Sequence, residues 1–140
     1  MKRITTRPFL QRVAMTLLAV LTTSAMAWAQ NPAVSYIDEN GETKIVTDYT
    51  VLTGSETPTD DYIELAPGTY VVNSTLTYQH PVKFTNDKGA MLILANGANL
   101  TIDPEQGDFN IISANLTICG EKDNPGTLTL RPYSDSDIYR

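Results

Sequence analysis

From residue 63 onward the sequence is built from short apolar-x-apolar triplets, separated by Gly, Asn, Asp and Pro. Alternation with a period of two places the outer residues of each triplet on one face of a β-strand and the middle residue on the other. No stretch after residue 29 has sustained helical periodicity, so the pattern predicts an all-β chain. The triplets are Leu76-Thr77-Tyr78, Val82-Lys83-Phe84, Leu92-Ile93-Leu94, Leu100-Thr101-Ile102, Phe109-Asn110-Ile111, Leu116-Thr117-Ile118 and Leu128-Thr129-Leu130.

The triplets recur at steps of about eight residues, with one slip near Asp108. Eight residues accommodate a short strand and a corner, and three such sides make a coil of about 24 residues. Coils of this kind stack into a parallel β-solenoid, in which each coil contacts only its neighbours. In this register Leu76 stacks on Leu100, and Leu92 stacks on Leu116. An antiparallel β-sandwich is the alternative fold.

The segment ANLTI occurs twice, at residues 98–102 and 114–118, sixteen residues apart. A coil of sixteen residues would stack the two copies directly, whereas a coil of 24 makes them two sides of one coil. We favour 24, because sixteen leaves Phe84 and Phe109 without equivalent sides. The expected interior side chains are those of Leu76, Tyr78, Phe84, Leu92, Leu94, Leu100, Ile102, Ile111, Leu116, Ile118, Leu128 and Leu130.

Residues 1–29 have the pattern of a signal peptide. The basic segment carries Lys2, Arg3, Arg7 and Arg12, and an apolar stretch from Val13 to Met26 is short for a transmembrane helix. Ala27-Trp28-Ala29 then predicts cleavage after Ala29, and we expect a protein that is secreted, periplasmic or on the cell surface. A retained membrane anchor is the alternative.

The remaining chain divides into two zones. Residues 30–67 are expected to form an irregular N-terminal cap with a β-hairpin, because Asn40-Gly41 favours a tight turn between two β-rich runs. Residues 68–140 are expected to form the solenoid coils, without a capping pattern after Leu130. Since an uncovered last coil exposes strand edges and core, we expect a truncated solenoid that is marginally stable or self-associates.

Charge and cysteine content exclude several functions. After residue 29, six basic residues stand against sixteen acidic ones, a net charge of −10 over 111 residues, which disfavours binding to nucleic acid or anionic membranes. Cys119 is the only cysteine and His80 the only histidine. A thiol–imidazole pair is disfavoured because His80 precedes Pro81 in a turn, and zinc sites usually need more such ligands. We therefore expect no catalytic residues, metal or cofactor.

Four segments resemble the N-terminal part of large secreted proteins of Bacteroidetes-type gut and oral bacteria. They are YIDENGE with YTVLTG, GTYVVNSTLTY, LILANGANLTI, and ANLTICG with GTLTL, within Val34–Leu130. The resemblance implies a parallel β-helix, a surface or carbohydrate-binding role without a defined activity, and further coils in longer chains. It carries no catalytic residues.

The favoured function is an exported, non-catalytic surface or adhesin-like module, with extracellular polysaccharide or a surface glycan as the ligand class. Sugar rings stack on exposed aromatic side chains, and only tyrosines remain because Trp28 leaves with the signal peptide. The alternative interpretation is that these tyrosines are partly buried at strand edges. They are Tyr36, Tyr49, Tyr62, Tyr70 and Tyr133.

Two further functions are kept. A β-helix polysaccharide lyase or hydrolase would need paired carboxylates, for which the candidates are Asp60 with Asp61, Asp103 with Glu105 and Asp108, and Asp135 with Asp137. Adjacent carboxylates in turns are more often solvated, and Asp123–Gly126 also reads as a turn. A purely structural stalk or scaffold is the third interpretation. In it, an outward threonine ladder reflects β propensity or binds a crystalline surface; its members are Thr77, Thr101, Thr117 and Thr129.

Overall fold

The computed structural model describes residues 30–85, 88–105 and 109–132, and these residues from Asn31 onward belong to one compact unit. They contain β-strands and no helix, which confirms the all-β prediction. The strands are β1 (Val34–Ile37), β2 (Thr43–Val46), β3 (Thr50–Val51), β4 (Ile63–Leu65), β5 (Gly68–Val72), β6 (Thr75–Tyr78), β7 (Val82–Phe84), β8 (Ala90–Leu94), β9 (Asn99–Ile102), β10 (Ile111–Ile112), β11 (Leu116–Gly120) and β12 (Thr127–Leu130).

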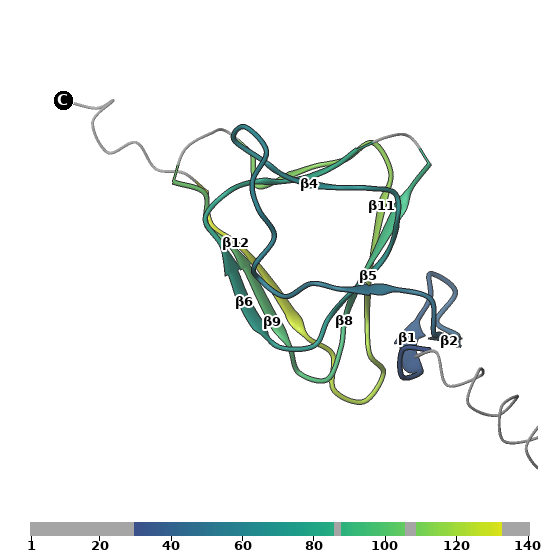
Figure 1. Ribbon diagram of the computed structural model, residues 1–140. Helices are drawn as coiled ribbons and strands as arrows, with labels where there is room; N and C mark the ends of the chain where they lie inside the picture. The colour runs from purple at the N-terminus through teal and green to yellow at the C-terminus, as the bar shows by residue number, and fades with distance from the viewer. Residues whose placement is uncertain (1–29, 86–87, 106–108, 133–140) are drawn as a thin grey trace, which may run out of the picture. The chain divides into compact units, whose positions relative to one another are not determined.

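Strands β3 to β12 form a parallel β-solenoid of about three turns, as the triplet spacing predicts. The chain passes in turn through three parallel sheets, ordered β4-β7-β10, β3-β5-β8-β11 and β6-β9-β12, which make the three sides of the coil (Figure 1). Each side is short, because every strand ends in a corner after two to five residues. The antiparallel sandwich is therefore wrong.

The register agrees with the 24-residue coil between β6 and β9 and departs from it elsewhere, since Leu100 pairs with Leu128, 28 residues on. Leu76 pairs with Leu100, 24 residues on, as expected. Leu92 pairs with Ile118 and not with Leu116, because the corners differ in length. Three residues separate β6 from β7, whereas eight separate β9 from β10.

The two ANLTI segments lie on different sides of the solenoid. The first contributes β9 and the second contributes β11, and these strands belong to different sheets. Leu100 pairs with Leu76 and Leu128, and it does not stack on Leu116. The sixteen-residue coil is therefore wrong.

The solenoid interior holds the apolar side chains that the triplets predict, although their burial falls off toward the last coil. The first seven expected residues, from Leu76 to Ile102, are all buried, and Ile111, Leu116 and Leu128 are partly buried against them. Ile118 and Leu130 are 45% and 46% exposed. Phe109, expected to begin a strand, lies outside β10 and is 63% exposed. The last described coil therefore leaves part of the core uncovered.

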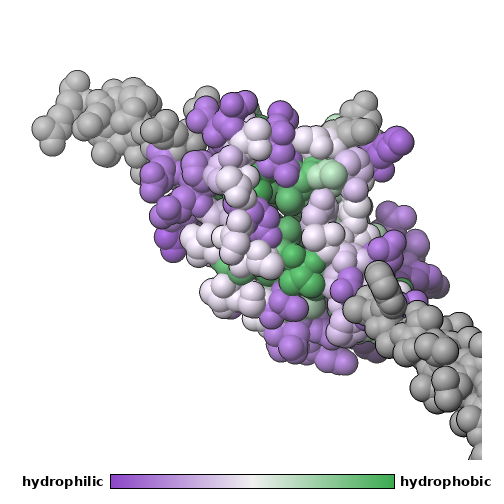
Figure 2. Space-filling view, in the orientation of Figure 1, coloured by the Kyte–Doolittle hydropathy of each residue, from purple (hydrophilic) through white to green (hydrophobic). Residues whose placement is uncertain are grey.

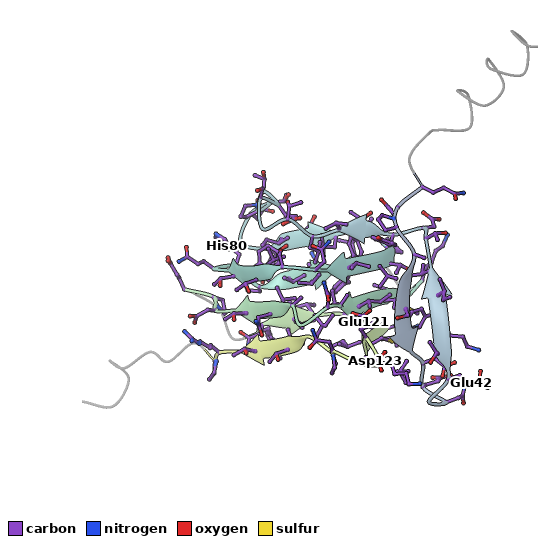
Figure 3. All side chains as sticks on the ribbon, turned by 90° about the horizontal axis from the view of Figure 1, so that it is seen from below. Glu42, His80, Glu121 and Asp123 are labelled. Atoms are coloured by element: carbon purple, nitrogen blue, oxygen red, sulfur yellow. The ribbon has the colours of Figure 1, made fainter. Side chains whose placement is uncertain are left out.

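Strands β1 and β2 form the antiparallel hairpin that Asn40-Gly41 predicts, with Asp38 accepting a backbone hydrogen bond from Gly41 in the turn. The hairpin lies against the outer face of the β3-β5-β8-β11 sheet and crosses its strands (Figure 3). It buries a second apolar cluster there. Val71, Ile93, Ala95 and Cys119 from the coils form this cluster, and Val34, Tyr36, Val46, Tyr49 and Met91 pack on it.

The segment between β3 and β4 covers the first coil. Leu52 is 2% exposed within the core, and Glu56 accepts hydrogen bonds from the Thr53 and Gly54 amides and from the Tyr78 hydroxyl. Figure 2 looks onto this end and shows polar residues around a small apolar centre. No large apolar side chain of the first coil is exposed among the described residues. The two ends of the solenoid therefore differ.

Candidate functional site

The outer faces of the three sheets offer three different surfaces. On β5, β8 and β11 the outward residues Val71, Ile93 and Cys119 are apolar, and the hairpin covers them. A strand that is apolar on both faces is buried on both, so Leu92-Ile93-Leu94 carried a sequence signal for this cover. The hairpin covers these residues and leaves a cleft of about 300 Å³ between itself and β8-β11.

The outer face of β4-β7-β10 carries an ion pair. Lys83 Nζ lies 3.0 Å from Glu64 Oε1 and 5.5 Å from the centre of the Tyr62 ring. Ile112 continues the row on β10. The charges on this face are matched with each other, which leaves no clustered charge for a ligand.

The outer face of β6-β9-β12 is uncharged and exposed, and we call it the threonine face. Thr77, Thr101 and Thr129 pair in register across the three strands, and Thr75, Asn99 and Thr127 form a second row. All six side chains are exposed except that of Thr101, which is half-buried. An ion pair between Arg131 and Asp103, 3.0 Å long, borders the face at the ends of the strands.

Strand geometry fixes the spacing of these hydroxyl groups. Neighbouring strands lie about 4.8 Å apart, and residues i and i+2 of one strand lie about 6.6 Å apart. The threonine face therefore presents donors, acceptors and methyl groups on a regular grid of two rows of three residues. Thr117 is not part of it, because β11 belongs to the sheet that the hairpin covers.

One shallow cleft brings together acid–base side chains from separate segments. Asp61 from the covering segment, His80 from the β6–β7 corner and Glu105 from the β9–β10 corner line it with Gln79, around about 130 Å³. All four side chains are exposed, and no hydrogen bond joins the three titratable groups. Their convergence depends on loop conformation, which the triplet pattern does not encode. Exposed carboxylates of this kind are solvated, so the cleft does not favour catalysis.

Cys119 and His80 do not form a catalytic pair. Cys119 lines a cleft of about 300 Å³ between the hairpin and β8-β11, with Tyr36, Asp38, Glu39, Lys44, Met91 and Thr117. His80 lies at a corner away from the hairpin (Figure 3) and lines other clefts. Burial, and then the nearby Asp38 carboxylate, raise the pKa of the Cys119 thiol, which disfavours the thiolate that a nucleophile needs.

None of the described tyrosines forms an exposed stacking platform. Tyr70 is buried, and Tyr36, Tyr49 and Tyr62 are half-buried. Tyr70 packs edge-on against Phe84, and the Tyr49 hydroxyl donates to the Pro32 carbonyl. Partial burial, the alternative interpretation of these residues, describes them better than sugar stacking.

The remaining sequence-based candidates are separated or lie elsewhere. Asp60 occupies a turn with φ of 54°, and Asp103 is engaged by Arg131. Residues 1–29, predicted to be a signal peptide, lie outside the described residues, as do Asp108, Tyr133, Asp135 and Asp137. Within the described part of the chain, no three His, Cys, Asp or Glu side chains are grouped for a metal ion.

Comparison of the chain with protein-family models, curated proteins and solved structures gives no match. Over residues 30–85, 88–105 and 109–132, no helix has the length and apolar character needed to span a bilayer.

Proposed function

We propose that this protein is an exported, non-catalytic surface module that adheres to extracellular polysaccharide through the threonine face. The observation that carries the proposal is the in-register alignment of Thr77, Thr101 and Thr129 beside Thr75, Asn99 and Thr127. Among the described sheet faces this one is neither covered by the hairpin nor occupied by an ion pair at its centre. Export rests on the pattern of residues 1–29, and the resemblance to secreted Bacteroidetes-type β-helix proteins agrees with it.

A neutral polymer fits this face better than a charged one. The face itself has no formal charge, while the chain after residue 29 has a net charge of −10, which repels acidic polysaccharides at a distance. Hydroxyl and amide groups on a regular grid match the repeated hydroxyl groups of an extended neutral glycan. The absence of an aromatic side chain at these six positions predicts weak binding per sugar that depends on several sugars at once.

The test is binding of the full chain, purified from the periplasm of an expression host, to a panel of soluble and insoluble neutral polysaccharides. Replacing Thr77, Thr101 and Thr129 together by Val removes three hydroxyl groups and keeps the β-branched shape. Three hydrogen bonds at about 1 kcal/mol each predict a loss of affinity of at least about tenfold. The control Thr43→Val, on the exposed hairpin strand β2, should change affinity less than about twofold. No binding in the panel, or equal binding by the triple variant, would contradict the proposal.

A structural scaffold is the second candidate, and the difference between the two ends of the solenoid favours it. Ile118 and Leu130 of the last described coil are exposed, whereas no large apolar side chain of the first coil is exposed among the described residues, which suits a platform on which further coils stack. An assay for released reducing ends on the same polysaccharides tests the third, enzymatic alternative. If the parent chain releases reducing ends and His80→Ala does not, the protein is an enzyme whose active site is the Asp61–His80–Glu105 cleft.

A further inference from the structure

We infer that Asn40 is a site of spontaneous chemical modification, in which its side chain closes onto the Gly41 backbone and is converted to aspartate or isoaspartate. The sequence contains two Asn-Gly pairs, Asn40-Gly41 and Asn96-Gly97. Glycine makes such a pair reactive because it has no side chain to obstruct its own nitrogen. Both asparagines are exposed in turns, so the surroundings of each glycine decide which pair reacts.

The reaction needs water and no other partner. The Gly41 nitrogen gives its proton to water and bonds to the Asn40 Cγ atom, while the Cγ–Nδ2 bond breaks and the amide nitrogen takes up a proton and leaves as ammonia. Water then opens the cyclic imide at one carbonyl to give aspartate, or at the other to give isoaspartate. Water is consumed, ammonia is released, and no atom is oxidised or reduced.

The Asn40-Gly41 turn has room for this rearrangement. A Cβ atom placed on Gly41 would meet no atom of the described chain within 4 Å. The Gly41 N–H donates to the Asp38 carbonyl at 3.0 Å, and the Asn40 N–H donates to the Asp38 carboxylate at 3.0 Å. Because these bonds lie within the hairpin, the turn can open locally without disturbing the solenoid core.

The Asn96-Gly97 turn is held by the next coil. The Gly97 N–H donates to the Asn124 carbonyl at 2.8 Å, and the Asn96 N–H donates to the Glu121 carboxylate at 2.6 Å. A Cβ atom on Gly97 would lie 2.8 Å from the Asn124 amide nitrogen, so that side chain packs directly on the glycine. Attack by the Gly97 nitrogen therefore requires a bond to another coil to break, and Asn40 should react faster.

Modification of Asn40 should loosen the cover over Cys119. The imide has no N–H at Gly41, so its hydrogen bond to Asp38 is lost, and isoaspartate lengthens the backbone of the turn by a methylene carbon. The product also adds a negative charge beside the Asp38 carboxylate, which lines the same cleft as Cys119. Since a two-stranded hairpin is marginally stable by itself, a distorted turn weakens its contact with the sheet.

The test is prolonged incubation of the full chain, purified from the periplasm, near neutral pH. Peptide mapping by mass spectrometry measures conversion at Asn40 and Asn96 separately, and enzymatic methylation detects isoaspartate. In the folded protein, conversion at Asn40 should be at least about fivefold faster than at Asn96, as one additional hydrogen bond would produce. In urea, where neither turn is held, the two rates should agree within about twofold.

Asn40→Gln is the matched variant, because its longer side chain would have to close a larger ring. It should abolish conversion at residue 40 and leave the circular dichroism spectrum unchanged. After incubation, Cys119 of the parent should react with a thiol reagent at least about threefold faster than before, whereas Cys119 of Asn40→Gln should not. No conversion at Asn40, equal or faster conversion at Asn96 in the folded protein, or Cys119 labelling that is unchanged in the modified parent or equally accelerated in Asn40→Gln would each overturn the inference.

Discussion

Tyr78 and Glu56 are joined by a 2.6 Å hydrogen bond in which the tyrosine hydroxyl donates to Glu56 Oε2. Tyr78 is a core residue of β6, 3% exposed, and Glu56 lies in the segment that covers the first coil. The bond therefore ties the cover to the coil beneath it. Burial, and then the Glu56 hydrogen bond and charge, raise the pKa of Tyr78 far above its ordinary value, so the hydroxyl remains protonated.

Replacing Tyr78 by Phe should lower the free energy of unfolding by about 1.5–3 kcal/mol, because a hydrogen bond to a charged group is lost from a shielded position. Urea unfolding measures this change. The control is Tyr70→Phe, which removes a hydroxyl that donates to the neutral Ala66 carbonyl at 2.7 Å. A neutral hydrogen bond contributes about 1 kcal/mol, so a loss for Tyr78→Phe no larger than that for Tyr70→Phe would contradict the assignment.

Glu56 should make stability depend on pH in the acid range. Burial by itself raises the pKa of Glu56, but hydrogen bonds from Tyr78 and the Thr53 amide outweigh it and hold the pKa below its ordinary value of 4.5. A carboxyl with a lowered folded-state pKa stabilises the fold above pH 4.5, and this contribution is lost as the pH falls through the folded value. The urea concentration at which half of the protein is unfolded should therefore decrease as the pH is lowered below 4.5.

In Glu56→Gln this part of the acid dependence should be absent. The control is Asp38→Asn, because hydrogen bonds from the Glu42 and Asn40 amides also lower the pKa of Asp38, from an ordinary value of 3.8. Loss of the Asp38 contribution begins below its ordinary pKa of 3.8, whereas loss of the Glu56 contribution begins below 4.5. An acid dependence unchanged by Glu56→Gln would show that other carboxyls govern it.

Much of the solenoid follows from the sequence because strand periodicity and corner residues are local properties. The outer residues of Leu100-Thr101-Ile102 point inward, and the pairing of Leu76 with Leu100 follows from their spacing. The shift that pairs Leu92 with Ile118 was not predictable from triplets, since the β9–β10 corner absorbs extra residues without altering the pattern within the strands.

The surfaces were less predictable than the core. Thr77, Thr101, Thr117 and Thr129 look alike in the sequence, but only sheet membership separates Thr117 from the other three. The apolar middle residue Ile93 of the triplet Leu92-Ile93-Leu94 indicates that the outer face of β8 is covered, as it is by the hairpin. The meeting of Asp61, His80 and Glu105 depends on three irregular segments, for which no periodic rule exists.

Cys119 should react slowly with a thiol reagent in the folded protein. Its side chain is 7% exposed beneath the hairpin, and its pKa is raised, so both access and the thiolate fraction are reduced. Tyr36→Ala removes part of the cover and should accelerate labelling, whereas Ile45→Ala, at an outward position on the same hairpin, should not. Equal rates in the folded parent and in urea would contradict the buried position of the thiol.

Side-chain packing should contribute less to stability in the last described coil than in the middle of the solenoid. Ile102→Ala empties a site that is 1% exposed, and a buried Ile-to-Ala change costs about 2–5 kcal/mol of unfolding free energy. Ile118→Ala, at 45% exposure in the last coil, should cost less than about 1 kcal/mol when measured by urea unfolding at low protein concentration. Equal costs at low concentration would show that the last coil is as well packed as the middle one.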